Sequence, residues 1–467
     1  MRVLPNIRPT PEQLQIIRRF KPGPLIIRGA AGSGKTSTAL LRLRSLISNW
    51  LNRRERLHLQ EPVNILVLTF NRTLRGYIQE LAKSQVTTND GLVLNISTFA
   101  KWAMDLTGYA SVLDDAKHRN TIKSLGTNIP LDTDFIVDEV NYITGRFLPE
   151  NLDDYITCRR DGRGATPRVD RVLRRKILDE IVIPFHKWKA KVRLIDWNDL
   201  AINLSRKRIA TGYDIIICDE TQDFSANEIR AIKKQLKDDH SLTLILDAAQ
   251  SIYARGFSWS EVGISIRPEN TFRLKKNYRN TVEIARFALP LLEGLTLDED
   301  GTLPDFKQCE RHGSVPKVLK GRYGQQLNYV IKYIKEEINL EQESIVFLHT
   351  KGGKWFSTIE SRIDAEGLDY VTMTRKSNWP DGNENIALST MHSAKGLEFD
   401  HVIILGLNQD LTPHGADEGD DRLERLRRLL AMSIGRARQS VILGYKPEEA
   451  SSLIQYLDRS TYDEIEL

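Results

Sequence analysis

The stretch PLIIRGAAGSGKT, Pro24–Thr36, constrains the fold of this chain more than any other. Its apolar run Leu25–Ile27 predicts a buried strand, and the residues from Lys35 onward predict a helix with one apolar face. Between them, glycines let backbone N–H groups approach an anion closely, where a Cβ would collide with it. The helix start adds a partial positive charge, Lys35 a full one, and Thr36 a hydroxyl for Mg²⁺. This order predicts a nucleotide-binding phosphate loop rather than an ordinary glycine-rich turn.

Length and composition indicate a protein with several compact units. The 467 residues suffice for about two to four of them, and 40% apolar with 28% charged residues is ordinary soluble composition. No apolar run approaches the ~20 residues of a membrane span. The cysteines Cys158, Cys218 and Cys309 lie far apart, without metal-site or disulfide spacing, which fits a reducing cytoplasm. The net charge of +5 permits nucleic-acid binding without arguing for it.

Polar motifs follow several more apolar runs that predict buried strands. In an α/β sheet, ligands bind at the carboxyl ends of the strands, so we expect these polar groups to face a ligand. The run at 63–70 ends in Thr69, Phe70, Asn71 and Arg72, the run at 92–96 is followed by Ser97, Thr98 and Phe99, and the run at 244–246 by Asp247, Ala248, Ala249 and Gln250.

Two adjacent carboxylates follow the predicted strand Ile215–Cys218. Asp219 and Glu220 come directly after it. One carboxylate can hold Mg²⁺ through water while the other orients or deprotonates an attacking water. An acid that caps the next helix is the structural alternative, but a phosphate loop about 180 residues earlier favours the Mg²⁺ role.

Residues 100–212 have a different character and predict a mostly helical segment. Within them, Cys158–Lys176 carries eight Lys and Arg residues against two Asp. Either a solvated helical face or a phosphate-contacting surface would have this composition.

Aromatic residues alternate with an arginine in the segment Ser251–Trp259. Its members Tyr253, Arg255, Phe257 and Trp259 could stack on unpaired bases, each stack being worth about 1–3 kcal/mol. Core packing is the alternative, and it suits Ile252 and Phe257 best.

A second lobe is predicted from alternating strands and helices, which indicate a parallel sheet. We expect it to begin with a strand at Phe272–Leu274. Further strands are expected at 317–319, 345–348, 386–388, 402–405 and 441–443, and helices at 325–338 and 355–363.

The ordered series of motifs resembles that of superfamily 1 helicases of the UvrD/Rep type, over nearly the whole chain. The motifs are the helix start at Gln13, then GAAGSGKT, LTFNR, STF, DETQD, LDAAQSIY, NYRN, TMHSAKGLEF and IGRAR. The resemblance implies an α/β fold of two RecA-like P-loop NTPase lobes with parallel sheets, ATP between them, and single-stranded nucleic acid across both. The first lobe would comprise residues 1–99 and 213–266, a mostly helical insertion residues 100–212, and the second lobe residues 267–467.

The resemblance also implies how residues surround ATP and Mg²⁺. Gln13 would read adenine, Tyr278 would stack on it, and Glu398 would lie beside the nucleotide. Glu220 would position or activate water, and Gln250, Arg279 and Arg436 would sense the γ-phosphate. The nucleotide-contacting set would be Gln13, Gly29, Ala30, Ala31, Gly32, Ser33, Gly34, Lys35, Thr36, Ser37, Tyr278 and Glu398; the catalytic set Lys35, Glu220, Gln250, Arg279 and Arg436; and the metal ligands Thr36 and Asp219.

The same resemblance implies a path for single-stranded nucleic acid along both lobes. The residues that would line it are Thr69, Phe70, Asn71, Arg72, Thr98, Phe99, Tyr253, Arg255, Trp259 and His392.

The chain departs from the family pattern at several points. Ser37 stands where an arginine often stacks on adenine, and Tyr253-Ala254-Arg255-Gly256-Phe257 is one residue shorter than the usual YxxRGA, which bears on the role of Trp259. Relatives insert a large subdomain before TMHSAKG, whereas here only residues 371–384 separate two predicted strands. We therefore expect a compact member without this second insertion, and no nuclease domain after Leu467.

The resemblance implies an ATP-dependent helicase or translocase moving 3′ to 5′ on single-stranded DNA, with RNA not excluded. A regulatory or nucleic-acid-sensing subunit that uses ATP as a switch is the alternative, for example as the partner of a nuclease in phage defence. An enzyme that binds ATP without hydrolysing it is disfavoured by the intact Lys35, Asp219, Glu220 and Arg436.

Overall fold

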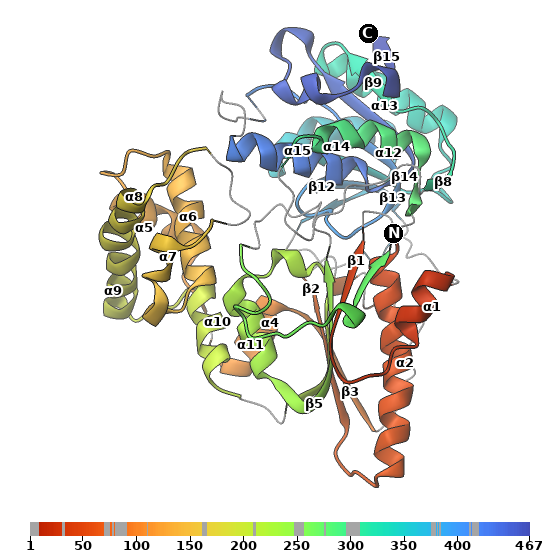
Figure 1. Ribbon diagram of the computed structural model, residues 1–467. Coiled ribbons are helices and arrows are strands. Elements are labelled where there is room, and N and C mark those ends of the chain that lie inside the picture. The colour runs from red at the N-terminus through yellow and green to blue at the C-terminus, as the bar shows by residue number, and fades with distance from the viewer. Residues whose placement is uncertain are drawn as a thin grey trace.

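The computed structural model describes residues 9–29, 33–69, 75–76, 79, 91–109, 111–160, 166–208, 212–246, 256–274, 277–295, 309–374, 380, 382, 384–410, 412 and 420–467. Figure 1 shows two lobes, one above the other, each organised around a sheet, with a group of helices to the left at the level where the lobes meet. The predicted α/β class with two parallel sheets is confirmed.

The first lobe contains a six-stranded sheet in the order β3-β2-β4-β5-β1-β6. All pairings between its described strands are parallel, so the predicted strands in this part of the chain are confirmed. The expected burial fails for the edge strand β3, where Leu92, Leu94 and Ile96 are half-buried and Val93 is exposed. The strands are β1 (Gly23–Gly29), β2 (Val63–Thr69), β3 (Leu92–Thr98), β4 (Tyr213–Cys218), β5 (Leu236–Leu246) and β6 (Thr271–Leu274).

Helices cover both faces of this sheet, which is why its central strands are continuous apolar runs. On one face Leu40 and Leu43 pack with Ile27, and on the opposite face Ile26 packs with Phe99. The helices are α1 (Pro11–Ile17) and α2 (Lys35–Arg56) on the first face, and α4 (Phe99–Thr107), α10 (Trp197–Arg206) and α11 (Ala226–Lys234) on the second.

The strand at Phe272–Leu274 was expected to open the second lobe, and this placement is wrong. It forms β6, which pairs in parallel with β1 from Ile26 to Gly29. Because Leu274 packs in the core beneath the phosphate loop, the chain completes the first sheet before it crosses to the second lobe.

The helices between β3 and β4 divide into two groups. α4 and α10 pack on the first sheet through side chains such as Trp102 and Leu204. The others enclose a core of their own, which runs from Leu113 to Phe185. The inserted unit with its own core is therefore narrower than the expected 100–212. Its helices are α5 (Asp115–Leu125), α6 (Thr133–Arg146), α7 (Asp154–Thr157), α8 (Arg171–Ile177), the π-helical turn η2 (Leu178–Val182) and α9 (Ile183–Val192).

The second lobe contains a seven-stranded sheet in the order β11-β12-β10-β13-β14-β9-β15. All its described pairings are parallel, which confirms the predicted strands from residue 317 onward. The strands are β9 (Lys317–Lys320), β10 (Ile345–His349), β11 (Tyr370–Met373), β12 (Ile386–Thr390), β13 (Phe399–Ile404), β14 (Ala437–Tyr445) and β15 (Asp463–Glu466); the helices are α12 (Val282–Ala288), α13 (Tyr323–Glu337), α14 (Ser357–Ala365) and α15 (Asp421–Ile434).

A small two-stranded sheet of β7 (Asn277–Thr281) and β8 (Cys309–Arg311) lies where the chain enters this second lobe. β11 and β12 are neighbours in the large sheet, with residues 374–385 between them. Within the part of the chain that the structure describes, no helix has the length and apolar character needed to cross a membrane.

Candidate nucleotide site between the two lobes

The phosphate loop joins β1 to α2, as the sequence predicts. Gly34 has a φ of +74° and caps α2, whose first residue is Lys35. A Cβ on Gly34 would lie 2.7 Å from Nε2 of Gln13, the end of a flexible side chain, so it is the left-handed conformation that requires glycine here. The ammonium of Lys35 donates to the carbonyl of Gly29 at 2.6 Å, which keeps it over the loop. Ala30, Ala31 and Gly32 lie outside the described residues.

Gln13 reaches this loop from the start of α1. Its Oε1 accepts from the backbone N of Thr10 at 2.9 Å in a capping box, and its Nε2 lies 3.5 Å from the carbonyl oxygen of Gly34. The predicted helix start near Gln13 is therefore confirmed, and Thr10 is its cap. The amide is buried against the loop, and its contact with adenine stays a prediction.

Two buried carboxylates follow β4 at the same edge of the sheet as the phosphate loop. The hydroxyl of Thr36 donates to Oδ2 of Asp219 at 2.9 Å. Burial, and then the neighbouring charge of Glu220, raise the pKa of Asp219 to about 7. A buried carboxylate beside a hydroxyl offers the hard oxygen ligands that Mg²⁺ prefers, so these residues fit the ion that the resemblance implies.

Glu220 has a left-handed backbone conformation, with a φ of +52°. Such a conformation costs a non-glycine residue of order 1–3 kcal/mol and persists only where its surroundings impose it. Burial would raise the pKa of this carboxyl group, but the charges of Lys395, Arg436 and Lys35 outweigh burial and lower it. Cations from both lobes therefore act on the same carboxylate.

Lys395 of the second lobe forms a buried ion pair with Asp223 of the first. Its ammonium lies 2.7 Å from Oδ1 and 2.6 Å from Oδ2 of Asp223, and 3.9 Å from Oε2 of Glu220. The side chains of Lys395 and Asp223 are 2% and 0% exposed. Neither residue was predicted to have a role, although they lie inside the motifs TMHSAKGLEF and DETQD.

Arg279 and Glu398, two predicted nucleotide-site residues, pair with each other. Arg279 donates to Oε1 of Glu398, and its Nη1 lies 3.4 Å from the carbonyl oxygen of Gly435. Burial would raise the pKa of Glu398, but Arg279 lowers it, with smaller contributions from Arg438 and Arg436. The structure thus brings Arg279, Glu398 and Arg436 together at one edge of the second lobe.

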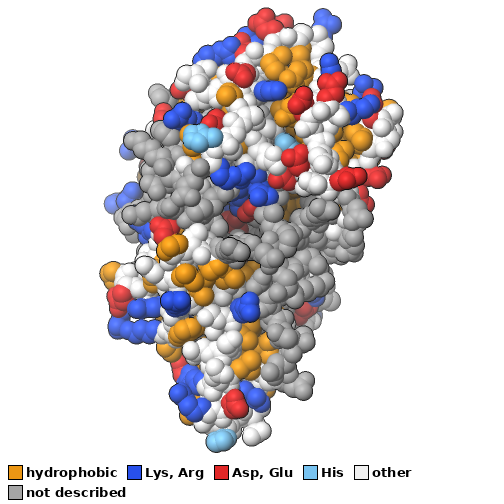
Figure 2. Space-filling view, turned by 90° about the vertical axis from the view of Figure 1, so that its right-hand side faces the viewer, with side chains coloured by type: hydrophobic (Ala, Val, Ile, Leu, Met, Phe, Trp, Pro, Cys, Tyr) orange, Lys and Arg blue, Asp and Glu red, His pale blue; other side chains and the backbone are white. Residues whose placement is uncertain are grey.

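Arg436 is 2% exposed and packs its Nε 3.2 Å from the sulfur of Met432 on α15. Its charge contributes to lowering the pKa of Glu220 in the first lobe and of Glu398 in the second. Gln250 and the side chain of Tyr278 lie outside what the structure describes. On the face shown in Figure 2, Lys and Arg side chains gather at the level between the lobes, beside acidic side chains.

The predicted path for nucleic acid is only partly described. Phe70, Asn71, Arg72, Tyr253 and Arg255 lie outside the described residues. Thr69 is buried at the end of β2, Trp259 is half-buried with its ring centroid 6.2 Å from that of Phe257, and His392 is half-buried in the turn after β12.

Thr98 and Phe99 have structural contacts instead. The hydroxyl of Thr98 caps α4 by accepting from the backbone N of Lys101. The Phe99 ring is 5% exposed and packs edge-on against Trp102 and Phe224. The interpretation of Phe99 as a base-contacting residue is therefore corrected: it is a core residue, because its ring faces the helices that cover the sheet.

Two arginines of the basic stretch Cys158–Lys176 make structural contacts. Arg160 donates through two nitrogens to the buried carboxylate of Glu139, both at 2.8 Å. Arg174 donates to the carbonyls of Tyr155, Ile156 and Cys158 at the end of α7. These two arginines therefore form neither a solvated face nor a phosphate-contacting surface. Each one donates to buried or helix-terminal acceptors in the insertion.

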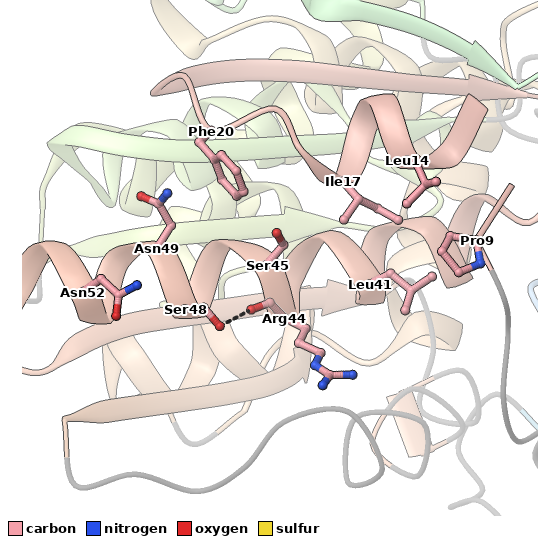
Figure 3. A pocket seen from close by; sticks show the side chains of 10 residues that line it. All are labelled: Pro9, Leu14, Ile17, Phe20, Leu41, Arg44, Ser45, Ser48, Asn49 and Asn52. Atoms are coloured by element: carbon pink, nitrogen blue, oxygen red, sulfur yellow. Dashed lines mark hydrogen bonds between the residues drawn. The ribbon is translucent and has the colours of Figure 1, made fainter. Parts of the chain in front are cut away.

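A separate open hollow of about 440 Å³ lies between α1 and α2 (Figure 3). Phe20, Leu14 and Ile17 face the α2 side chains Leu41, Ser45 and Asn49 across it. It shares no residue with the phosphate loop or with the carboxylates of β4, so we assign it no part in nucleotide chemistry.

Two family models match the chain. The UvrD/REP helicase N-terminal domain matches residues 9–264, and the UvrD-like helicase C-terminal domain matches residues 371–448. Among curated relatives, ATP-dependent DNA helicase Rep of Buchnera aphidicola (subspecies Schizaphis graminum) is 38% identical over 60 residues, which are 13% of this chain and 9% of the relative. DNA helicase II of Escherichia coli is 44% identical over 69 residues, which are 14% of this chain and 9% of the relative.

A solved C-terminal domain of a possible DNA helicase from Lactobacillus plantarum WCFS1 is 20% identical, with a TM-score of 0.30, and covers 40% of this chain and 98% of the solved one. The matched segments of Rep and DNA helicase II span 9% of each of these two curated relatives. The N-terminal model alone covers more than half of the chain, in the lobe that carries the phosphate loop and the paired carboxylates. The chain belongs to the UvrD/Rep family of helicases.

Proposed function

We propose that this protein hydrolyses ATP between its two lobes and uses the cycle to move 3′ to 5′ along single-stranded DNA, separating strands as it goes. One observation carries the proposal: Lys395 of the second lobe lies 2.6 Å from Asp223 and 3.9 Å from Glu220, two carboxylates that follow a first-lobe strand beside the phosphate loop. Such an arrangement makes hydrolysis depend on how the lobes sit against each other. The direction of movement and the choice of DNA come from the family resemblance.

In this proposal the first lobe binds ATP. Lys35, at the start of α2, and the backbone N–H groups of that helix start hold the phosphates. Thr36 and Asp219 would hold Mg²⁺, which supplies charge neutralisation on the phosphates. Glu220 accepts a proton from, or orients, the attacking water, and its lowered pKa keeps it ionised for this role.

The second lobe supplies the positive charge that hydrolysis requires. Arg279 and Arg436 would exchange their present partners Glu398 and Met432 for the γ-phosphate. An arginine of this kind typically contributes about 10³–10⁵ to the rate. Because these arginines belong to the other lobe, their binding draws the lobes together and their release lets the lobes part. Repeated closing and opening would move a strand held by both lobes.

Strand displacement tests the proposal directly. The substrates are DNA and RNA duplexes with a 3′ or a 5′ single-stranded tail, incubated with ATP and Mg²⁺, and Lys35→Ala serves as the inactive control. We expect displacement only from 3′-tailed DNA. Displacement from 5′ tails alone would overturn the direction. ATP turnover that ignores single strands, with no displacement from any substrate, would favour the alternative of an ATP-driven switch.

A further inference from the structure

A partly buried ion pair joins the helical insertion to the first lobe, with the Glu261 side chain 26% exposed. Arg146, the last residue of α6, donates from Nε to Oε1 of Glu261 at 3.0 Å and from Nη2 to Oε2 at 3.1 Å. The Arg146 side chain is 9% exposed. A two-pronged contact of this kind fixes both distance and orientation, because the guanidinium is planar and rigid.

Further hydrogen bonds hold both partners in place. Nη1 of Arg146 donates to the hydroxyl of Tyr142 and to the carbonyl of Arg159 at 3.0 Å. Arg230, from α11 of the first lobe, donates to the carbonyl of Arg146 at 2.7 Å and to that of Glu261 at 3.3 Å. Burial lowers the pKa of Arg146, but its bonds to Glu261 outweigh this and raise the pKa, so the pair is charged. The contact is therefore held in one geometry by several hydrogen bonds, unlike an isolated ion pair on the surface.

Glu261 belongs to a tight turn that begins at Trp259, which is predicted to contact single-stranded nucleic acid. The backbone N of Ile264 donates to the carbonyl of Trp259 at 2.9 Å, which closes the turn. The backbone N of Glu261 also donates to the hydroxyl of Ser258, the residue directly before the turn, at 3.3 Å. Glu261 lies two positions after Trp259, so the ion pair with Arg146 anchors the turn that carries Trp259.

We propose that Arg146 is a positioning residue that couples the helical insertion to the turn carrying Trp259, so that the insertion sets how tightly this turn contacts a single strand. The proposal rests on the function proposed above, since it needs a strand to bind beside Trp259. In this proposal the insertion holds the Trp259 turn in position for a single nucleic-acid strand, through the bidentate pair of Arg146 and Glu261.

Two neutral variants and their combination test the coupling. Arg146→Gln and Glu261→Gln each remove the ion pair while keeping polar side chains of similar size. Both should weaken binding of a fluorescently labelled single-stranded 20-mer about tenfold, within the range of energies measured for residues in contact. Each should raise the strand concentration for half-maximal ATPase stimulation by the same factor, with an unchanged maximal rate. The double variant should be no weaker than either single one.

A matched control uses another ion pair between the insertion and the first lobe. Arg206 of α10 lies 2.7 Å from Glu150, and both side chains are 54% exposed. Arg206→Gln should leave strand affinity unchanged. If Arg146→Gln fails to fold, Glu261→Gln alone still decides. Unchanged strand affinity in folded Glu261→Gln, or an equal loss in Arg206→Gln, would overturn the coupling. A wild-type protein that binds no strand would instead overturn the proposed function, and this inference with it.

Discussion

Lys395→Met tests how far the stability of the protein depends on keeping both partners of the buried Lys395–Asp223 pair at the lobe interface. At 2.7 Å and an effective dielectric constant of about 20, the attraction between Lys395 and Asp223 is about 6 kcal/mol. Desolvation of the two ions costs several kcal/mol each, so the pair as a whole contributes little to stability. Removing one partner is different, because it leaves a buried carboxylate without its counter-charge.

We therefore expect Lys395→Met to lower the free energy of unfolding by about 3–5 kcal/mol. In Lys395→Met/Asp223→Leu the uncompensated carboxylate of Asp223 is gone, and most of this loss should be recovered. Urea unfolding followed by tryptophan fluorescence measures both values, read at the first transition because two lobes need not unfold together.

A surface lysine of the same lobe provides the control. Lys335 lies 2.8 Å from Glu366 with its side chain 53% exposed, so Lys335→Met should leave the urea midpoint unchanged. Our reasoning would be refuted if Lys395→Met unfolded like the wild type, or if the double variant were as unstable as the sum of its single changes.

Three further outcomes follow from the structure. Arg436→Ala should lower the maximal rate of ATP hydrolysis by about 10³ or more while nucleotide affinity, measured by equilibrium titration, changes little. Arg160→Ala should lower the free energy of unfolding in urea by about 3–5 kcal/mol, because it leaves the buried carboxylate of Glu139 without its counter-charge. Burial lowers the pKa of His349 from 6.5 to about 4. The contribution of this neutral, buried imidazole to the free energy of unfolding is therefore fully present above pH 6.5 and is lost as the pH falls toward 4. The change corresponds to about 3 kcal/mol, and in urea unfolding between pH 7.5 and 4.5 His349→Phe should lack this part of the decline.

Sequence was sufficient where a local pattern determines the structure. The phosphate loop is set by the apolar run that ends at Gly29 and by the left-handed Gly34, both of which are visible within a dozen residues. The same holds for Asp219 and Glu220, which directly follow β4. Their meeting at one edge follows from parallel topology, since carboxyl ends of parallel strands lie together.

The contacts that the sequence analysis missed join residues far apart in the chain. Lys395 and Asp223 are 172 positions apart, and Arg146 and Glu261 are 115 apart. Pairing between such positions depends on how whole lobes pack, which no local periodicity records. Phe99 was misinterpreted for a related reason: an aromatic residue after a strand can face either the ligand edge or the covering helices, and only the packing of α4 decides.

The most direct test of the central claim, that the two lobes form one nucleotide site, is the rate of ATP hydrolysis titrated with single-stranded DNA in the wild type and in Arg436→Ala. We predict that DNA stimulates the wild type, whereas the variant binds ATP and DNA but keeps a low maximal rate. A wild-type maximal rate in Arg436→Ala would mean that the second lobe contributes no catalytic charge, and it would contradict the account.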